Sequence, residues 1–114
     1  MHELSLTKPI LTLALEHASK HNASSIRKIS LSIGKLSCTN SQSVRWCFQH
    51  LSKNTLAEHA ELIIEEENAH AQCLNCSRHF EIHSLLEACP YCQSHNIKRQ
   101  GGEGFVLKSI TIDA

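Results

Sequence analysis

The cysteines of this 114-residue chain offer its clearest chemistry. Two Cys-x-x-Cys pairs, Cys73-Leu-Asn-Cys76 and Cys89-Pro-Tyr-Cys92, are separated by twelve residues. Each pair forms a tight turn that directs two sulfur atoms to one point, and four thiolates complete a tetrahedral shell for Zn²⁺. Four sulfur ligands leave no position for water or substrate, so the spacing predicts a structural zinc rather than a catalytic one. Two disulfides are the alternative, but the sequence shows no secretory signal peptide, which favours metal.

The N-terminus carries a second set of potential metal donors. Met1-His2-Glu3 offers an α-amine, backbone amide nitrogens and an imidazole, which together can close fused chelate rings on one ion. A planar set of nitrogen donors with deprotonated amides suits Ni²⁺ or Cu²⁺ better than Zn²⁺. From these residues alone, a start with Met-His by chance is the alternative, because the motif is so short.

The other histidines are scattered along the chain, which contains nine in total. His17 and His21 lie one helical turn apart, a spacing that can bind metal. They also fall within an apolar helical arc, so we expect partly buried side chains satisfied by local carbonyls. His79, His83 and His95 lie in or beside the cysteine pairs, where they are expected to be surface residues, with sensing of nickel or pH as the alternative.

Several single residues have both a structural and a functional interpretation. Cys47 is expected to be a small hydrophobic residue of the core, and Cys38 an exposed thiol after a strand. Trp46 is either an edge residue or a contact for a partner. The acidic run at residues 65–67 is interpreted as a solvated face, with steering of a basic partner as the alternative.

Composition excludes some classes of function. The chain has 11 basic and 11 acidic residues, so it lacks the positive charge expected for binding nucleic acid or a membrane surface. Aromatic residues make up only 4%, which argues against a stacking platform for single strands. No apolar run approaches the roughly 20 residues of a transmembrane helix. The sequence therefore predicts a cytoplasmic protein.

A helix is predicted over residues 4–21, directly after the N-terminal donors. Its apolar residues recur at the helical period and form one wide arc: Leu4, Ile10, Leu11, Leu13, Ala14, Leu15 and Ala18. Pro9 has to lie in or near the first turn, which makes Ser5 or Thr7 the expected N-cap. Residues 1–3 then form a free arm ahead of the helix, and Asn22 is its expected C-terminal stop.

The rest of the chain alternates between strands and one further helix. Residues 26–33 alternate apolar and polar side chains, which predicts a half-buried strand ended by Gly34. Asn40 or Ser41 is expected to cap a second helix, which ends near Asn54 and has one apolar stripe: Val44, Cys47, Phe48 and Leu51. Further strands are predicted at residues 60–66, with Leu62 and Ile64 inward, and at 105–112.

This order predicts an α+β fold, with a three-stranded sheet, two helices on one of its faces and an inserted zinc-ribbon module built on the four cysteines. The expected domains are residues 1–69 with 99–114, which bind nickel, and residues 70–98, which bind zinc. The module contains almost no core of its own, so its folding should depend on the metal.

The whole chain resembles the HypA/HybF family of hydrogenase maturation factors, and most closely its HybF branch. The resemblance rests on the start Met1-His2-Glu3-Leu4-Ser5-Leu6, on residues 33–38 (Ile-Gly-Lys-Leu-Ser-Cys) and on the two cysteine pairs. It continues through Cys47-Phe48, Ala60-Glu61-Leu62 and the final Leu107-Lys108-Ser109-Ile110-Thr111-Ile112. Either the N-terminal hexapeptide or the four cysteines alone would be less specific than both together.

The resemblance implies a nickel metallochaperone rather than an enzyme. It places nickel on Met1, His2 and Glu3, and a structural zinc on Cys73, Cys76, Cys89 and Cys92. It also implies a HypB-type GTPase as a partner and the [NiFe]-hydrogenase large subunit as the receiver of nickel, with urease and its accessory proteins as a possible second client. The alternative function is a zinc-ribbon module that binds protein or nucleic acid, for which the neutral charge is a weakness.

Overall fold

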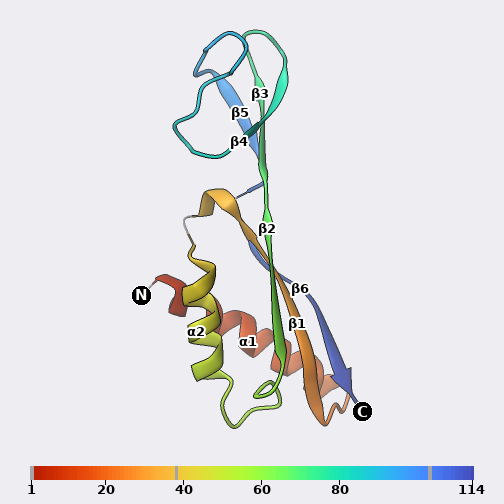
Figure 1. Cartoon of the computed structure of the whole chain (residues 1–114). Helices are drawn as coiled ribbons and strands as arrows, with labels where there is room; N and C mark the ends of the chain where they lie inside the picture. Colours follow the sequence, from red (N-terminus) through yellow and green to blue (C-terminus); the bar gives the residue numbers. More distant parts are fainter. Residues whose placement is uncertain (1, 38, 103) are drawn as a thin grey trace.

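The computed structural model describes residues 2–37, 39–102 and 104–114, apart from the side chains of residues 2 and 3. These residues form two α-helices, a short 3-10 helix and six strands in two three-stranded sheets (Figure 1). The elements are α1 (His2–Lys20), β1 (Ser25–Gly34), η1 (Lys35–Ser37), α2 (Ser41–Leu51), β2 (Glu61–Glu67), β3 (Ala69–Cys73), β4 (His79–Ile82), β5 (Ile97–Gln100) and β6 (Phe105–Asp113). Within this described part, neither helix has the length and apolar character needed to cross a membrane.

The larger sheet has the strand order β2-β1-β6, with β1 in the centre. β1 and β2 run parallel because α2 carries the chain back between them, whereas β6 is antiparallel to β1. The register places Ile29 of β1 between Leu62 of β2 and Ile110 of β6, which gives one apolar row across the sheet. The predicted α+β architecture is therefore confirmed.

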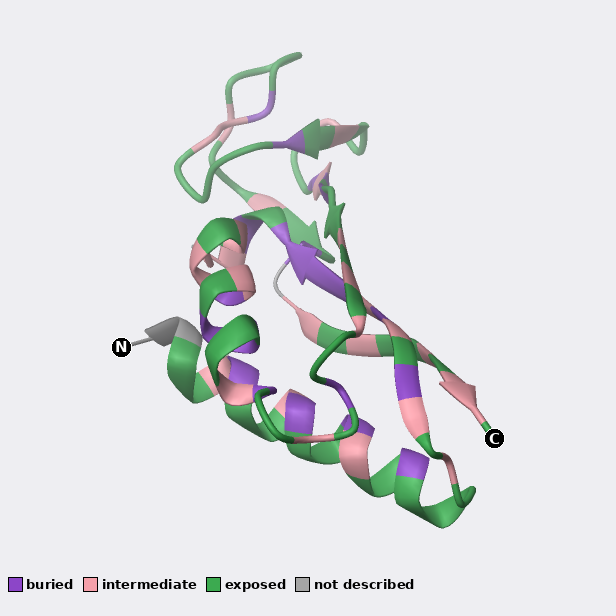
Figure 2. Cartoon of the chain, turned by 60° about the horizontal axis from the view of Figure 1, so that its bottom comes forward, coloured by how far each residue is buried: buried purple, intermediate pink, exposed green. Residues whose placement is uncertain are grey.

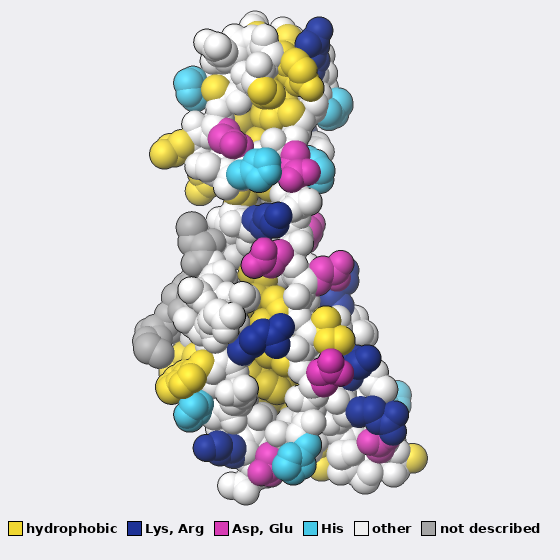
Figure 3. Space-filling view, in the orientation of Figure 1, with side chains coloured by type: hydrophobic (Ala, Val, Ile, Leu, Met, Phe, Trp, Pro, Cys, Tyr) yellow, Lys and Arg dark blue, Asp and Glu magenta, His cyan; other side chains and the backbone are white. Residues whose placement is uncertain are grey.

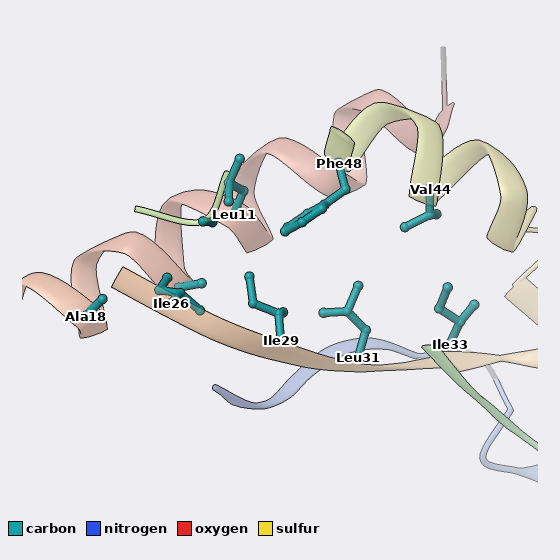
Figure 4. Close-up of a cluster of buried hydrophobic side chains, with 10 residues drawn as sticks. Leu11, Ala18, Ile26, Ile29, Leu31, Ile33, Val44 and Phe48 are labelled. Carbon is teal, nitrogen blue, oxygen red and sulfur yellow. The ribbon is translucent and has the colours of Figure 1, made fainter. Parts of the chain in front are cut away.

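Both helices cover the same face of this sheet, and the main core lies between the two layers (Figures 1 and 4). Figure 4 shows Ile29, Leu31 and Ile33 pointing from β1 toward the helices. Leu11 of α1 and the predicted stripe of α2, which includes Val44 and Phe48, close the core from the other side. Burial of this apolar face is what holds the helices on the sheet.

The beginning of α1 differs from the prediction. The helix starts at His2, so residues 2 and 3 belong to it rather than to a free arm, and Pro9 lies inside the helix rather than in its first turn. The buried face begins with Thr7, which is 1% exposed and precedes Leu11 by one turn. Packing of this early turn keeps the helix intact ahead of Pro9, although proline removes one backbone donor.

The predicted apolar arc of α1 was also too wide. Leu4 and Leu13 are 39% and 41% exposed, whereas Ala14 and Ala18 are fully buried. The arc included more residues than one helical face can turn toward the core, and the polar Thr7 takes a place on that face.

The predicted C-terminal stop of α1 and the predicted N-cap of α2 are confirmed, whereas α2 ends at Leu51 rather than near Asn54. After α1, Asn22 adopts a left-handed conformation (φ 55°), the Asn22 N–H bonds the Ser19 carbonyl, and the Ala23 N–H bonds the Ala18 carbonyl. This bonding pattern is the Schellman motif that ends many helices. At the start of α2, the Asn40 side chain accepts a hydrogen bond from the Ser43 N–H at 3.1 Å.

The smaller sheet has the order β4-β3-β5 and extends the molecule at one end (Figure 1). β2 runs into β3 with only Asn68 between them, and the chain returns from β5 to β6 through residues 101–104. The small core of this sheet consists of Ala69, Ala71 and Ile82, with Leu36 of η1 inserted from the side of the larger sheet. This insertion physically joins the two sheets.

Gly102 lies where the two connections between the sheets cross. Its φ is +74°, and a Cβ placed on it would lie 2.4 Å from the Cβ of Ala69. The Gly102 carbonyl also accepts a hydrogen bond from the Leu36 N–H at 2.7 Å. Only glycine allows both the left-handed backbone and this close approach.

Candidate metal centre

The four predicted cysteines converge at the far end of the smaller sheet. The Sγ atoms of Cys73, Cys76, Cys89 and Cys92 all lie within 4.8 Å of one another. The Cys73–Cys92 and Cys76–Cys89 sulfur distances are 3.5 and 3.6 Å. Zinc bound by four thiolates at about 2.3 Å requires sulfur atoms about 3.8 Å apart, so the cluster has close to the required dimensions. None of the described cysteines forms a disulfide.

The two cysteine turns have the same local structure. In each, the N–H of the first cysteine bonds the carbonyl five residues later, Arg78 or Ser94, at 2.9 Å. The residue four positions after that cysteine, Ser77 or Gln93, is left-handed and donates its N–H back to the cysteine carbonyl. The turns therefore form two copies of one motif, each presenting a pair of sulfur atoms.

Backbone and side-chain donors surround the sulfur atoms. The N–H groups of Asn75 and Cys76 both point to the Cys73 sulfur at 3.4 Å, and the Tyr91 N–H points to the Cys89 sulfur at the same distance. The Asn75 side-chain amide lies 3.6 Å from the Cys92 sulfur. Such donors favour the thiolate form that a metal requires. The sequence prediction identified the four cysteines but not Asn75, whose position between two ligands is the only signal available.

The surroundings of the cluster shift the pKa values of two of its thiols in opposite directions. Backbone donation from Ser94, helped by the Asn75 amide, lowers the pKa of Cys92 to about 6. Backbone donation from Arg78 acts to lower the pKa of Cys76, but burial and the neighbouring cysteines outweigh it and raise that pKa to about 11. Thiolates this close repel one another, so the cluster retains protons that a divalent cation displaces. This donor set fits zinc in a closed, structural site.

The predicted nickel donors cannot be compared in the same way. Met1 and the side chains of His2 and Glu3 lie outside the described residues, and the backbone of residues 2 and 3 forms the start of α1. Among the described residues, the four cysteines are the only group of three or more histidine, cysteine, aspartate or glutamate side chains close enough to share one metal. Nickel binding at the N-terminus therefore remains a prediction.

The remaining histidines do not join the metal centre. His17 and His21 are exposed rather than partly buried, because the face of α1 that turns inward carries Ala14 and Ala18 instead. His79, His83 and His95 are also exposed, and His83 lies 3.3 Å from Glu81. Histidines are spread over the surface seen in Figure 3.

Of the two single cysteines, Cys47 is buried in α2, as predicted, and Cys38 lies outside the described residues. Trp46 is 55% exposed and stacks on His50, with ring centroids 4.0 Å apart. The His50 Nδ1 atom lies 2.9 Å from the Trp46 carbonyl oxygen. This arrangement places Trp46 on the surface of α2, as the sequence suggested.

The fold and the four-sulfur centre define a small α+β protein with a closed metal site. Two solved structures share this fold over 98% of the chain: the Ni metallochaperone HypA from Helicobacter pylori (26% identity, 97% of that chain, TM-score 0.69) and a second HypA protein (27%, 96%, TM-score 0.72). A family model described as hydrogenase/urease nickel incorporation, metallochaperone, hypA, matches residues 1–112. The chain belongs to this HypA family of metallochaperones, which are maturation factors rather than enzymes.

Named relatives cover the chain almost completely. Hydrogenase maturation factors HypA from Chlorobium limicola and Psychromonas ingrahamii are 39% and 37% identical to it, over 99% of the chain and 97% and 99% of their own length. Hydrogenase maturation factor HybF from Escherichia coli is 32% identical over 99% of the chain and all of its own length. These identities place the chain in the HypA/HybF family, but they do not favour the HybF branch in particular.

Proposed function

We propose that this chain binds Ni(II) at its N-terminus and helps insert it into the large subunit of [NiFe]-hydrogenase. The donors are the Met1 amine, the backbone amide and imidazole of His2, and Glu3. The observation that carries the proposal is the family match over residues 1–112, which includes these donors in a family described by nickel incorporation.

The start of α1 supports this role for the backbone. The first four N–H groups of a helix have no acceptor within it, so the amides of His2 and Glu3 are not needed to hold α1 together. They can lose their protons to nickel without breaking a helical hydrogen bond. Since α1 is anchored from Thr7 onward, the backbone amides of residues 2 and 3 stand at the end of a fixed helix.

A terminal site also suits release of the metal. Donors at a chain end can leave the ion one at a time, whereas a closed cage has to open as a whole. The amides bind only when deprotonated, so nickel affinity should fall as pH falls.

We also propose that zinc occupies the four-cysteine centre and that residues 70–98 form a separate zinc-binding domain beside the nickel-binding domain, residues 1–69 with 99–114. The sulfur distances and the small core of the second sheet support this division. A HypB-type GTPase is the proposed partner for transfer, and urease with its accessory proteins is a second proposed client, in line with the family description.

The test is a nickel titration of the full chain with its own N-terminus, with zinc quantified in the same samples. The wild type should bind about one nickel in a planar nitrogen environment, visible in its absorption spectrum. His2→Ala should lose this nickel and keep its zinc. His21→Ala, at an exposed position just beyond the far end of α1, is the matched control and should bind nickel as the wild type does.

Equal nickel binding by the wild type and His2→Ala would contradict the proposal. Nickel would then be held elsewhere, and a zinc-ribbon module for protein interaction would be the better account of the chain.

A further inference from the structure

β6 has one edge that no described strand pairs with. It is the last strand in the order β2-β1-β6, and it extends over nine residues. A groove of about 480 Å³ runs beside it, with one wall from β6 and the other from Leu13 and His17 of α1 and from His21 just after the helix. Long, unprotected edge strands of this kind are sites at which another chain can add a strand.

The core-facing side chains of β6 are incompletely covered. Phe105, Leu107, Ile110 and Ile112 pack against the main core, yet all four remain partly exposed. On the neighbouring strand β1, Ile29, Leu31 and Ile33 of the same face are buried, and Figure 2 colours most of this strand purple or pink. The helices therefore leave an apolar strip along β6 that faces the groove.

The backbone of β6 offers hydrogen bonds on this outer edge. The Gly104 and Asp113 carbonyls accept bonds from β1 and its approach, from Gly34 N–H at 2.7 Å and Ser24 N–H at 2.9 Å. Successive residues of a strand direct their backbone groups to opposite edges. Alternation back from Asp113 places the groups of Ile112 and Ile110 on the outer edge. The register shift near Ser109 puts Leu107 there as well.

The opposite edge of the sheet, formed by β2, is protected against strand addition, unlike the β6 edge. On β2, the Leu62 carbonyl accepts a hydrogen bond of 2.7 Å from the Arg45 guanidinium of α2. The strand then continues into Glu65, Glu66 and Glu67, whose charges discourage strand pairing. Among the described residues, no comparable side-chain bond to the β6 backbone occurs between Leu107 and Ile112.

The charges around the groove indicate what binds there. Its lining includes one charged side chain, Lys108, the hydrogen-bonding imidazoles of His17 and His21 and, within the described residues, no carboxylate. A segment with acidic side chains would complement this lining, whereas a basic one would be repelled. We propose that β6 and α1 bind an extended, acidic and aliphatic segment of a partner protein, which adds to the larger sheet as a fourth strand. This inference concerns docking and does not depend on nickel binding.

The test begins with a phage-displayed library of nonapeptides, selected on the zinc-loaded full chain without nickel. We expect enrichment of acidic sequences in which aliphatic residues alternate. A synthetic peptide of the enriched sequence should bind Leu13→Glu and Lys108→Glu roughly tenfold or more weakly than the wild type, because both changes place a carboxylate beside the peptide. Leu86→Glu and Lys98→Glu are matched controls at exposed positions of the smaller sheet and its loop, and should bind normally.

Amide hydrogen exchange then distinguishes strand addition from other modes of docking. Bound peptide should slow exchange at Ile110 and Ile112, whose N–H groups face the outer edge. Ser109 and Thr111 face β1 and should be protected already in the free protein. A failure to enrich acidic peptides, equal binding by Leu13→Glu, or protection without this alternation would overturn the inference. None of these results would affect the nickel proposal, which the His2 titration tests separately.

Discussion

Ser77 and Gln93 show how single residues shape the metal centre. Each is left-handed, with φ of 65° and 62°, and each stands four positions after the first cysteine of its pair. A non-glycine residue in this conformation costs roughly 1–2 kcal/mol, so it persists only where the surroundings hold it. Here the hydrogen bonds to Cys73 and Cys89 hold it, and bound zinc would add to them.

The cysteines could be predicted from sequence because ligand spacing determines local geometry directly. The exposure of His17 and His21 could not, since it depends on which face of α1 turns inward. That choice is made by tertiary packing, in which the polar Thr7 is buried while Leu13 is exposed. Hydropathy alone assigns these two residues the other way round.

Gly102→Ala should destabilise the protein by about 2–4 kcal/mol, because the alanine would have to adopt a left-handed backbone and its methyl group would clash with a neighbour. The added methyl group would meet Ala69 at 2.4 Å. Gly101→Ala is a matched control, since Gly101 has nearly the same φ of +73° but its nearest neighbour is the flexible Glu67 carboxylate at 3.3 Å. Denaturant unfolding of both variants measures the difference, and equal losses would show that the close approach at Ala69 is unimportant.

At the scale of elements, regular patterns gave reliable predictions. The alternation in β1 and the stripe of α2 predicted both elements and their buried faces, because period and burial agree there. The start of α1 was missed because Pro9 suggested that the helix begins within a turn ahead of it, whereas the packed helix already begins at His2. The strands β3, β4 and β5 were not predicted individually, since short strands around a metal site carry weak alternation and depend on the centre to align them.

Removal of zinc should unfold the smaller sheet and leave the larger one folded. The core of the smaller sheet is small. Its buried members are Ala69, Ala71, Ile82 and the inserted Leu36, with Phe80 and Ile97 partly buried against them, which is too little to hold three short strands. Amide exchange after chelation should therefore lose protection in β3–β5 and keep it in β1. Cys76→Ser should reproduce this loss, and Cys47→Ala, which removes a cysteine outside the centre, should keep its zinc. Retained protection in β3–β5 would contradict a structural role for the metal.

As a whole, the molecule is a rod. Its principal extents are 55 × 27 × 17 Å, and its radius of gyration is 17.7 Å. A compact domain of this length would have a radius of gyration of about 13 Å. The elongation arises because β3 continues the line of β2, so that the smaller sheet extends beyond the larger one instead of packing on the helices (Figure 1). Sequence could predict the insertion of the module but not this direction, which the contacts of Leu36 and Gly102 determine.

Leu36→Ser should loosen the smaller sheet from the larger one without loss of zinc. Leu36 is 7% exposed, and its side chain completes the small core from across the junction. Residual dipolar couplings of the two sheets should fit one common alignment in the wild type and diverge in the variant. Leu86→Ser, at an 87% exposed position, is the control. A common alignment in Leu36→Ser would show that the backbone connections alone fix the orientation.

The crossing of the two connections at Ala69 and Gly102 also limits how the sheets can move. A single chain connection between two sheets would permit rotation of one sheet about the connecting chain as well as bending. Two connections that run in opposite directions and touch where they cross act as a hinge, which resists twisting and leaves one principal direction of bending. We therefore expect the metal centre to move relative to the helices mainly along one arc.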